Sequence, residues 1–160
     1  MGTTGAGKTT VGTLLARKLD WRFADADDFH SPENVEKMRE GKPLDDADRR
    51  PWLQALREEI ESWLRTQEDV VLACSALKRS YRDQLRASGD VKFVYLKGSY
   101  DEIAQHLEGR QGHFAKRDLL ASQLETLEEP EVDEGALVIP VTQSPEEAAC
   151  SIRQALSFGP

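Results

Sequence analysis

The stretch Gly2-Thr3-Thr4-Gly5-Ala6-Gly7-Lys8-Thr9, near the start of the chain, decides the fold. It matches the pattern G-x-x-x-x-G-K-[ST] at every specified position. Glycines in such a loop allow backbone angles that turn successive N–H groups inward, so that the loop and the next helix N-terminus can surround phosphate oxygens. The motif therefore predicts a phosphate-binding loop and a bound nucleotide.

Two side chains of this loop have predicted chemical roles. Lys8 reaches the β- and γ-phosphates, and the hydroxyl of Thr9 binds the Mg²⁺ that bridges the same oxygens. A glycine-rich turn that only caps a helix is the alternative, which the Lys-Thr pair and the amphipathic helix after it disfavour. We therefore predict ATP and Mg²⁺ as cofactors, with Lys8 also catalytic. The predicted nucleotide contacts are Gly2, Thr3, Thr4, Gly5, Ala6, Gly7, Lys8, Thr9 and Thr10.

Helical and extended patterns alternate after this loop. One amphipathic pattern begins near Lys8, a second helix opens at Ser31-Pro32, and the clearest helical pattern covers residues 52–64. Short β-branched or aromatic runs predict strands at 21–27, 70–74, 91–96 and 136–141. This alternation implies right-handed crossovers and a parallel sheet with helices on both faces. We predict an α/β fold in a single domain, residues 1–160.

Composition excludes several classes of protein. The chain has 160 residues, 39% apolar and 31% charged, as expected of a globular protein with one core. Its net charge of −8 and the lack of a Lys/Arg run argue against a nucleic-acid partner. The apolar stretches are too short to span a membrane, and no targeting segment is evident. The two cysteines, Cys74 and Cys150, are too few for a disulfide framework, so we expect a cytoplasmic protein without a membrane partner.

An acidic cluster, Asp25-Ala26-Asp27-Asp28-Phe29-His30, follows the first predicted strand. Ligands in open parallel sheets bind at the carboxyl ends of strands, and the alternation of a strand puts Asp25 and Asp27 on the same side. One carboxylate can support the Mg²⁺ and its water shell while the other accepts the proton of an attacking hydroxyl. Solvated acidic residues at a strand end are the alternative, which the nearby phosphate-binding loop disfavours.

A triphosphate and an acidic acceptor also need cations to complete the site. Arg49, Arg82 and Arg110 stand at boundaries between predicted elements and are the candidates, although each could equally be a solvated arginine. The tract Gly109-Arg110-Gln111-Gly112-His113-Phe114 predicts a glycine-hinged lid, at about residues 109–118, that brings Arg110 over the phosphates as a catalytic group.

Three longer blocks of sequence are more specific than the phosphate-binding loop. They are Asp25-Ala26-Asp27-Asp28-Phe29-His30-Ser31-Pro32-Glu33-Asn34, Asp48-Arg49-x-Pro51-Trp52 and Ala73-Cys74-Ser75-Ala76-Leu77-Lys78. With these blocks, essentially the whole chain resembles the thermoresistant gluconokinases. The resemblance implies phosphorylation of D-gluconate to 6-phospho-D-gluconate by ATP, feeding the pentose phosphate pathway. It also implies a nucleoside-monophosphate-kinase-like fold and a homodimer.

The same resemblance implies roles for individual residues. Asp27 would be the base on the acceptor side, and Asp25 would join Thr9 at the magnesium ion. Arg49 and Arg82 would hold gluconate or the transferred phosphoryl group, within or beside an acceptor-binding helical region at about residues 30–66. Further residues expected near the acceptor or the lid are Ser75, Lys78 and His113, with Gln123, Glu125 and Thr126 behind the lid.

The phosphate-binding loop begins at residue 2, whereas the motif needs a strand in front of it. In kinases of this fold that strand lies in the middle of the sheet and is buried on both faces. About five absent apolar residues, at roughly 1.5–3 kcal/mol each, would remove roughly 8–15 kcal/mol, as much as the whole stability of a typical domain. We therefore expect a missing or truncated first strand, with Met1 as its last residue.

Two other functions remain open from the residues alone. The same fold could phosphorylate shikimate or a nucleotide, although the blocks at 49–52 and 73–78 speak against this. Alternatively, the chain could be a non-catalytic nucleotide-binding relic, although the presence of Lys8, Thr9, Asp25 and Asp27 argues against long-standing loss of activity. A screen of acceptors separates the enzymatic alternatives.

Overall fold

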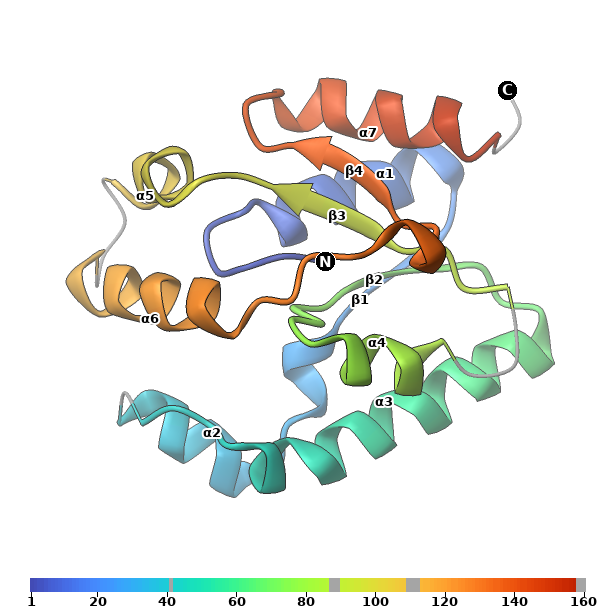
Figure 1. Ribbon diagram of the computed structural model, residues 1–160. Coiled ribbons are helices and arrows are strands. Elements are labelled where there is room, and N and C mark those ends of the chain that lie inside the picture. The colour runs from blue at the N-terminus through green and yellow to red at the C-terminus, as the bar shows by residue number, and fades with distance from the viewer. Residues whose placement is uncertain (41, 87–89, 109–112, 158–160) are drawn as a thin grey trace.

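The computed structural model describes residues 1–40, 42–86, 90–108 and 113–157, with the backbone alone at 113–116. Strands alternate with helices along the chain (Figure 1), which confirms the predicted α/β class. The strands are β1 (Arg22–Asp25), β2 (Val70–Ala73), β3 (Val94–Lys97) and β4 (Leu137–Pro140). The helices are α1 (Lys8–Leu19), α2 (Pro32–Arg39), α3 (Asp46–Thr66), α4 (Arg79–Leu85), α5 (Tyr100–Leu107), α6 (His113–Thr126) and α7 (Pro145–Ala155), with 3₁₀ turns η1 (Ala26–Phe29) and η2 (Val132–Glu134).

Helix α3 is longer than the apolar pattern at 52–64 predicts. The carboxylate of Asp45 accepts the N–H of Asp48 at 2.8 Å, and the carboxylate of Asp48 accepts the N–H of Asp45 at 3.2 Å. This reciprocal capping satisfies two N–H groups at the helix end, so the helix begins at Asp46. Pro51 therefore lies inside α3, where it removes one main-chain hydrogen bond without ending the helix.

The strands form two parallel pairs, not the single sheet that the sequence predicts. β1 pairs with β2, and β3 pairs with β4. Met1 lies between the pairs: its carbonyl accepts the N–H of Leu96 at 2.9 Å, and its amino group donates to the carbonyl of Val94. The N–H of Gly2 donates to the carbonyl of Ser75 at 3.2 Å, on the other side. Met1 and Gly2 therefore join the two strand pairs through main-chain hydrogen bonds.

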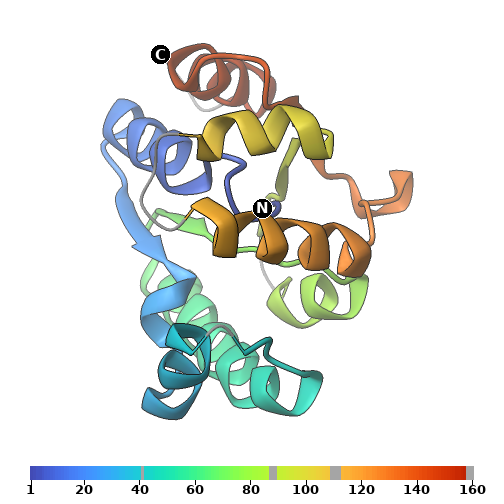
Figure 2. The same ribbon diagram turned by 90° about the vertical axis from the view of Figure 1, so that its left-hand side faces the viewer.

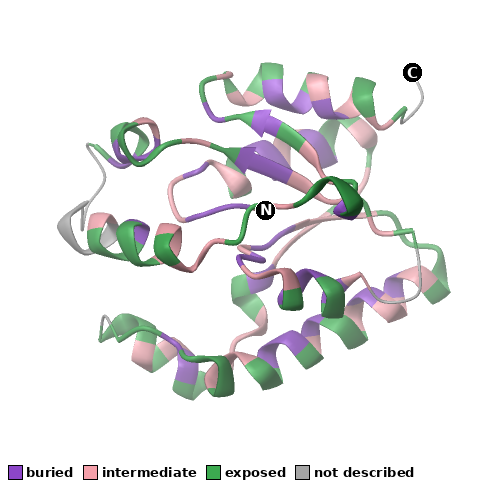
Figure 3. Ribbon diagram, viewed as in Figure 1, coloured by how far each residue is buried: buried purple, intermediate pink, exposed green. Residues whose placement is uncertain are grey.

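Helices cover the strand pairs on both faces (Figures 1 and 2). Helices α1 and α7 pack on one face with α5 and α6 beside them, whereas α3 and α4 pack on the other. Buried residues gather along the inner sides of these helices and on the strands (Figure 3). Within the described ranges, no helix is long and apolar enough to cross a membrane.

A buried ion pair joins α4 to η2. Each of the three guanidinium nitrogens of Arg82 donates a hydrogen bond: two reach the carboxylate of Glu134, at 2.6 and 2.8 Å, and the third reaches the carbonyls of Ala76 and Leu77. The two charged side chains are only 1% and 3% exposed. The hydrogen bonds from Arg82 are the main cause that lowers the pKa of Glu134 to about 2. This pair joins α4 to η2, and the buried side chain of Arg82 has no surface that a substrate could contact.

We expect Arg82→Ala to lower the free energy of unfolding by about 3–5 kcal/mol, because Glu134 would stay buried without a partner. Arg79→Ala is the matched control. Arg79 lies on the same helix but pairs with Glu131 and Asp133 near the surface, where ion pairs contribute about 0–1 kcal/mol. Urea denaturation of both variants at neutral pH makes the comparison, and equal losses in the two would contradict the role given to Arg82.

The same pair makes stability depend on pH in acid. The pKa of Glu134 is lowered from 4.5 to about 2 in the folded chain, so the unfolded chain takes up this proton first as the pH falls. The stabilisation is complete above about pH 4.5 and is lost as the pH falls toward about 2. The stability difference between the wild type and Arg82→Ala should therefore shrink over that range.

Candidate active site

The phosphate-binding loop connects Met1 to α1, and its shape requires glycine. Gly2, Gly5 and Gly7 have φ angles of 141°, 79° and 90°, in the region that side chains disfavour. A Cβ atom on Gly5 would also lie 2.9 Å from the side chain of Leu107 in α5. The glycines therefore permit both the loop conformation and its close packing against α5.

Lys8 lies at the first position of α1 and turns back over the loop. Its ammonium donates to the carbonyl of Thr3 at 2.7 Å. Burial lowers the pKa of Lys8, while the charges of Asp27, Cys74 and Asp25 act in the opposite direction. No salt bridge to Lys8 occurs among the described residues, so its positive charge is available to an anion in the loop.

The loop is also bound to α6. The N–H of Thr4 donates to the side-chain oxygen of Gln123 at 2.6 Å. The resemblance to gluconokinases implies a place for Gln123 behind the lid, whereas in the structure its side chain lies directly against the phosphate-binding loop. Gln123 therefore belongs among the residues that position this loop.

The acidic turn after β1 meets the phosphate-binding loop through one hydrogen bond. The hydroxyl of Thr9 donates to a carboxylate oxygen of Asp25 at 3.1 Å, and the other oxygen of Asp25 accepts the N–H of Asp27 at 3.1 Å. These hard oxygen groups suit Mg²⁺, which usually binds one or two protein ligands together with phosphate and water. The described residues hold no cluster of three or more His, Cys, Asp or Glu that could bind a metal alone. The donor set thus fits a magnesium ion that arrives with a nucleotide.

Asp27 is the second residue of the turn η1 and has the electrostatics of a base. Burial raises its pKa, and the carboxylates of Asp25 and Asp28 raise it further, whereas His30 and Lys8 lower it. A carboxylate with a raised pKa binds a proton more tightly and is a stronger base. Asp27 therefore combines a position beside Lys8 with the chemistry of a proton acceptor.

His30, at the end of the acidic turn, packs against Trp52 of α3. Their rings stack with centroids 4.6 Å apart, and the indole N–H of Trp52 donates to the carbonyl of Ala26 at 2.7 Å. Burial lowers the pKa of His30, Asp27 opposes this effect, and the charge of Arg49 adds to it. The Nδ1 atom of His30 is buried and has no hydrogen-bond partner among the described residues. His30 was not among the predicted site residues, although its place at the end of the acidic block could have indicated it.

Cations gather on the α3 and α4 side of the acidic turn. The ammonium of Lys78 lies 2.9 Å from both carboxylate oxygens of Asp46, and the hydroxyl of Tyr81 donates to the same carboxylate. Arg49 lies over the ring of Tyr81, with its guanidinium carbon 5.9 Å from the ring centroid. The bonds from Tyr81 and then Lys78 lower the pKa of Asp46. The predicted residues Arg49 and Lys78 thus lie together, joined by Asp46 and Tyr81, which sequence reasoning missed.

The other predicted residues divide into three groups. Ser75 follows β2 and touches the phosphate-binding loop through its carbonyl. The expected contact of Arg82 with the substrate is corrected, because its side chain is buried in the ion pair with Glu134. Arg110, the side chain of His113 and the first part of the predicted lid at 109–118 lie outside the described residues.

The sequence and structure of this chain are similar to those of known kinases. The model of the shikimate kinase family matches residues 4–157. The thermoresistant gluconokinase of Escherichia coli strain K12 is 42% identical over 161 residues, which cover 99% of this chain and 92% of that protein. The crystal structure of a gluconokinase from Sinorhizobium meliloti 1021 has a TM-score of 0.84 at 42% identity, covering 99% of this chain and 93% of that chain.

Shikimate kinases themselves are more distant from this chain. The structure of the shikimate kinase from Bacteroides thetaiotaomicron has a TM-score of 0.71 at 22% identity, covering 98% of this chain and 96% of that one. At this identity the likeness shows a common fold alone, whereas the gluconokinases share both the fold and much of the sequence. The chain therefore belongs to the gluconokinases, a family built on the shikimate kinase type of domain.

Proposed function

We propose that this protein transfers the γ-phosphoryl group of ATP to a hydroxyl of D-gluconate, which gives ADP and 6-phospho-D-gluconate. The observation that carries the proposal is the hydrogen bond between Thr9 and Asp25, which joins the phosphate-binding loop to the acidic turn. This bond supports Asp27, two residues after Asp25, as the base that would act on the acceptor near the γ-phosphate. Membership of the gluconokinases supports gluconate as the acceptor.

The nucleotide side of the site would work by positioning and charge. The inward N–H groups of the glycine loop and the ammonium of Lys8 would bind the β- and γ-phosphates. Thr9 and Asp25 are the residues that would hold Mg²⁺, which would offset the negative charge of the phosphates. Partial burial strengthens the effect of Lys8, because an ammonium away from bulk water interacts more strongly with an anion.

The acceptor side would supply a base and a clamp. Asp27 would accept the proton of the attacking hydroxyl as the phosphoryl group moves to its oxygen. Arg49 and Lys78 would hold the carboxylate of gluconate, since a guanidinium binds a carboxylate through two parallel hydrogen bonds. The ring of His30, which stacks on Trp52, would limit the acceptor on the remaining side.

We also propose a homodimer in the cytoplasm, and Arg110 as a further cation at the phosphates. These follow from the resemblance to gluconokinases and from the sequence pattern at 109–118. Light scattering after gel filtration measures the oligomeric state, and Arg110→Ala tests the second cation through the turnover number.

The first test measures ADP release by the purified chain with MgATP and one acceptor at a time. We expect D-gluconate to increase release strongly, and shikimate or nucleoside monophosphates to leave it at the background rate. Lys8→Ala should abolish the gluconate-dependent release, because the transferring phosphoryl group loses its main cation. Equal release with every acceptor would contradict the gluconate assignment.

Asp27→Asn should lower kcat by about 10²–10⁴-fold while ATP affinity stays nearly unchanged, as expected of a general base. Asp28→Asn is the matched control, because Asp28 is the neighbouring exposed carboxylate on the same turn. Steady-state kinetics and nucleotide titration measure the two effects separately. An unchanged kcat in Asp27→Asn would remove Asp27 from the role of base.

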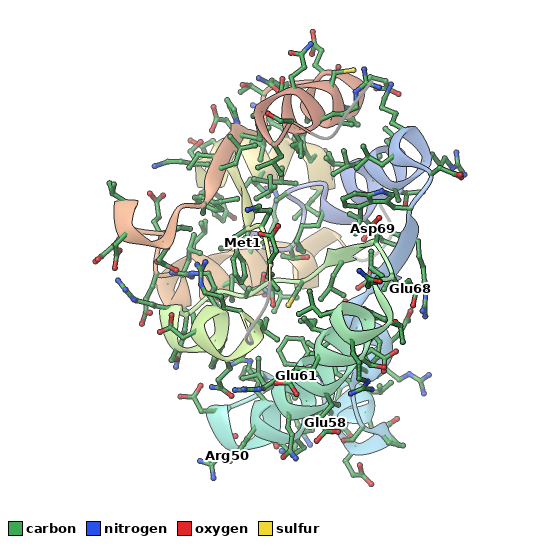
Figure 4. The ribbon with its side chains drawn as sticks, turned by 90° about the vertical axis from the view of Figure 1, so that its right-hand side faces the viewer. Met1, Arg50, Glu58, Glu61, Glu68 and Asp69 are labelled. Atoms are coloured by element: carbon green, nitrogen blue, oxygen red, sulfur yellow. The ribbon has the colours of Figure 1, made fainter. Side chains whose placement is uncertain are left out.

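Arg49→Ala should raise the KM for gluconate by about 10–100-fold, as expected from the loss of charge-assisted hydrogen bonds, with little change in the KM for ATP. Arg50→Ala is its control, because the neighbouring Arg50 lies on the exposed side of α3 (Figure 4). A larger effect on the KM for ATP would place Arg49 on the nucleotide side instead.

A further inference from the structure

Three side chains converge on the carboxylate of Asp46, the first residue of α3. The ammonium of Lys78 lies 2.9 Å from both carboxylate oxygens, and the hydroxyl of Tyr81 donates to one of them. A guanidinium nitrogen of Arg49 lies 3.9 Å from that oxygen and donates to the hydroxyl of Tyr81 at 3.5 Å. We call Arg49, Lys78 and Tyr81 the carboxylate clamp. In this structure a carboxylate of the protein itself fills the clamp.

The clamp is more enclosed than the carboxylate that it holds. The side chain of Asp46 is 63% exposed. Those of Arg49 and Lys78 are 22% and 29% exposed, and Tyr81 is buried. Both cations also lie against the ring of Tyr81, at 5.9 and 5.5 Å from its centroid, where the face of the ring attracts them. The clamp therefore keeps contacts of its own when Asp46 turns away, and Asp46 can turn into water without leaving its charge buried and unpaired.

Within the described chain, no residue outside the clamp bonds to the side chain of Asp46. Its hydrogen bonds come from Lys78 and Tyr81. The cap at the start of α3 is made by Asp45 and Asp48, so the helix begins there without the side chain of Asp46. Asp46 is therefore free to leave the clamp when a second carboxylate arrives.

The clamp lies beside the acidic turn that carries the base candidate Asp27. The charges of Arg49 and Asp27 both act on His30. The ring of His30 stacks on Trp52, which lies about one turn after Arg49 on α3. The carboxylate of gluconate and the hydroxyl that would be phosphorylated are at opposite ends of the molecule. Gluconate held at the clamp by one end can thus present its other end to the acidic turn.

We propose that the clamp is the subsite for the carboxylate of gluconate, with Tyr81 as a third ligand, and that the carboxylate of Asp46 is an internal competitor which gluconate displaces. This assignment depends on the proposed function, because gluconate is the acceptor named there. The exchange replaces one carboxylate with another, so the clamp keeps its charge balance and its charge-assisted hydrogen bonds. A neutral ligand would break the bonds to Asp46 without replacing them, so the clamp favours acidic acceptors.

Removal of the competitor should strengthen gluconate binding. We expect Asp46→Ala to lower the KM for gluconate by about three- to tenfold, in line with the modest strength of a partly exposed ion pair, with kcat and the KM for ATP unchanged. Glu58→Gln is the matched control, because Glu58 is an exposed carboxylate farther along α3 (Figure 4). It should leave the KM for gluconate as in the wild type. Steady-state rates of ADP release give these constants.

Tyr81→Phe provides the second arm of the test, because it removes one hydroxyl and keeps the ring. With Asp46 present, both carboxylates lose the same hydrogen bond and the losses partly cancel, so the KM for gluconate should rise by only about two- to fourfold. In a chain that also carries Asp46→Ala, only gluconate loses the bond, and the KM should rise by about tenfold or more. This dependence of one substitution on the other measures the competition for Tyr81.

An unchanged or higher KM for gluconate in Asp46→Ala would overturn the proposal, as would an equal effect of Tyr81→Phe in both backgrounds. A crystal structure of the wild type with gluconate provides a check that needs no variant. The gluconate carboxylate should lie within about 3.2 Å of the Lys78 ammonium and the Tyr81 hydroxyl, and Asp46 still bound there would overturn the proposal as well. Absence of gluconate-dependent ADP release by the wild type would instead contradict the proposed function, and with it this subsite.

Discussion

Main-chain hydrogen bonds at Met1 and Gly2 are the interactions on which the rest of this structure depends. Met1 bonds to β3, and Gly2 bonds to the carbonyl of Ser75 after β2. These two residues are therefore the main-chain link between two strand pairs that otherwise share no ladder in the described chain. The phosphate-binding loop begins at this link, so the packing of the sheet determines where the loop and Lys8 lie.

The arrangement of charge around the loop separates two kinds of ionised residue. Arg82 and Glu134 are buried in a matched pair whose hydrogen bonds are satisfied within the protein, so they stabilise the fold. Lys8 and Arg49 remain partly accessible, and the charge of Lys8 acts on Asp27 while that of Arg49 acts on His30 from the α3 side. Asp46 holds Lys78 and Tyr81 in place on that side. Cationic side chains thus lie on two sides of the acidic turn, Lys8 next to Asp27 and Arg49 next to His30.

Several local features could be predicted because their physical cause is local. Ser31 caps α2 and Pro32 opens it, as their order along the chain indicates. The strands β1, β2 and β4 fall within the predicted apolar runs, whereas β3 begins at Val94 and not at Val91. The start of α3 was missed because the apolar pattern begins at Trp52, while the helix depends on the capping pair Asp45 and Asp48.

The sequence by itself determined the α/β class, the phosphate-binding loop, and the pairing of this loop with the acidic block that ends β1. Those features follow from short-range patterns: glycine conformations, helix capping and the alternation of strands. Only the tertiary structure decided that Arg82 is buried, that Gln123 binds the loop, and that Asp46 and Tyr81 join Arg49 and Lys78. These contacts join residues far apart in the chain, and side-chain burial and direction depend on how whole helices pack, which no local pattern encodes.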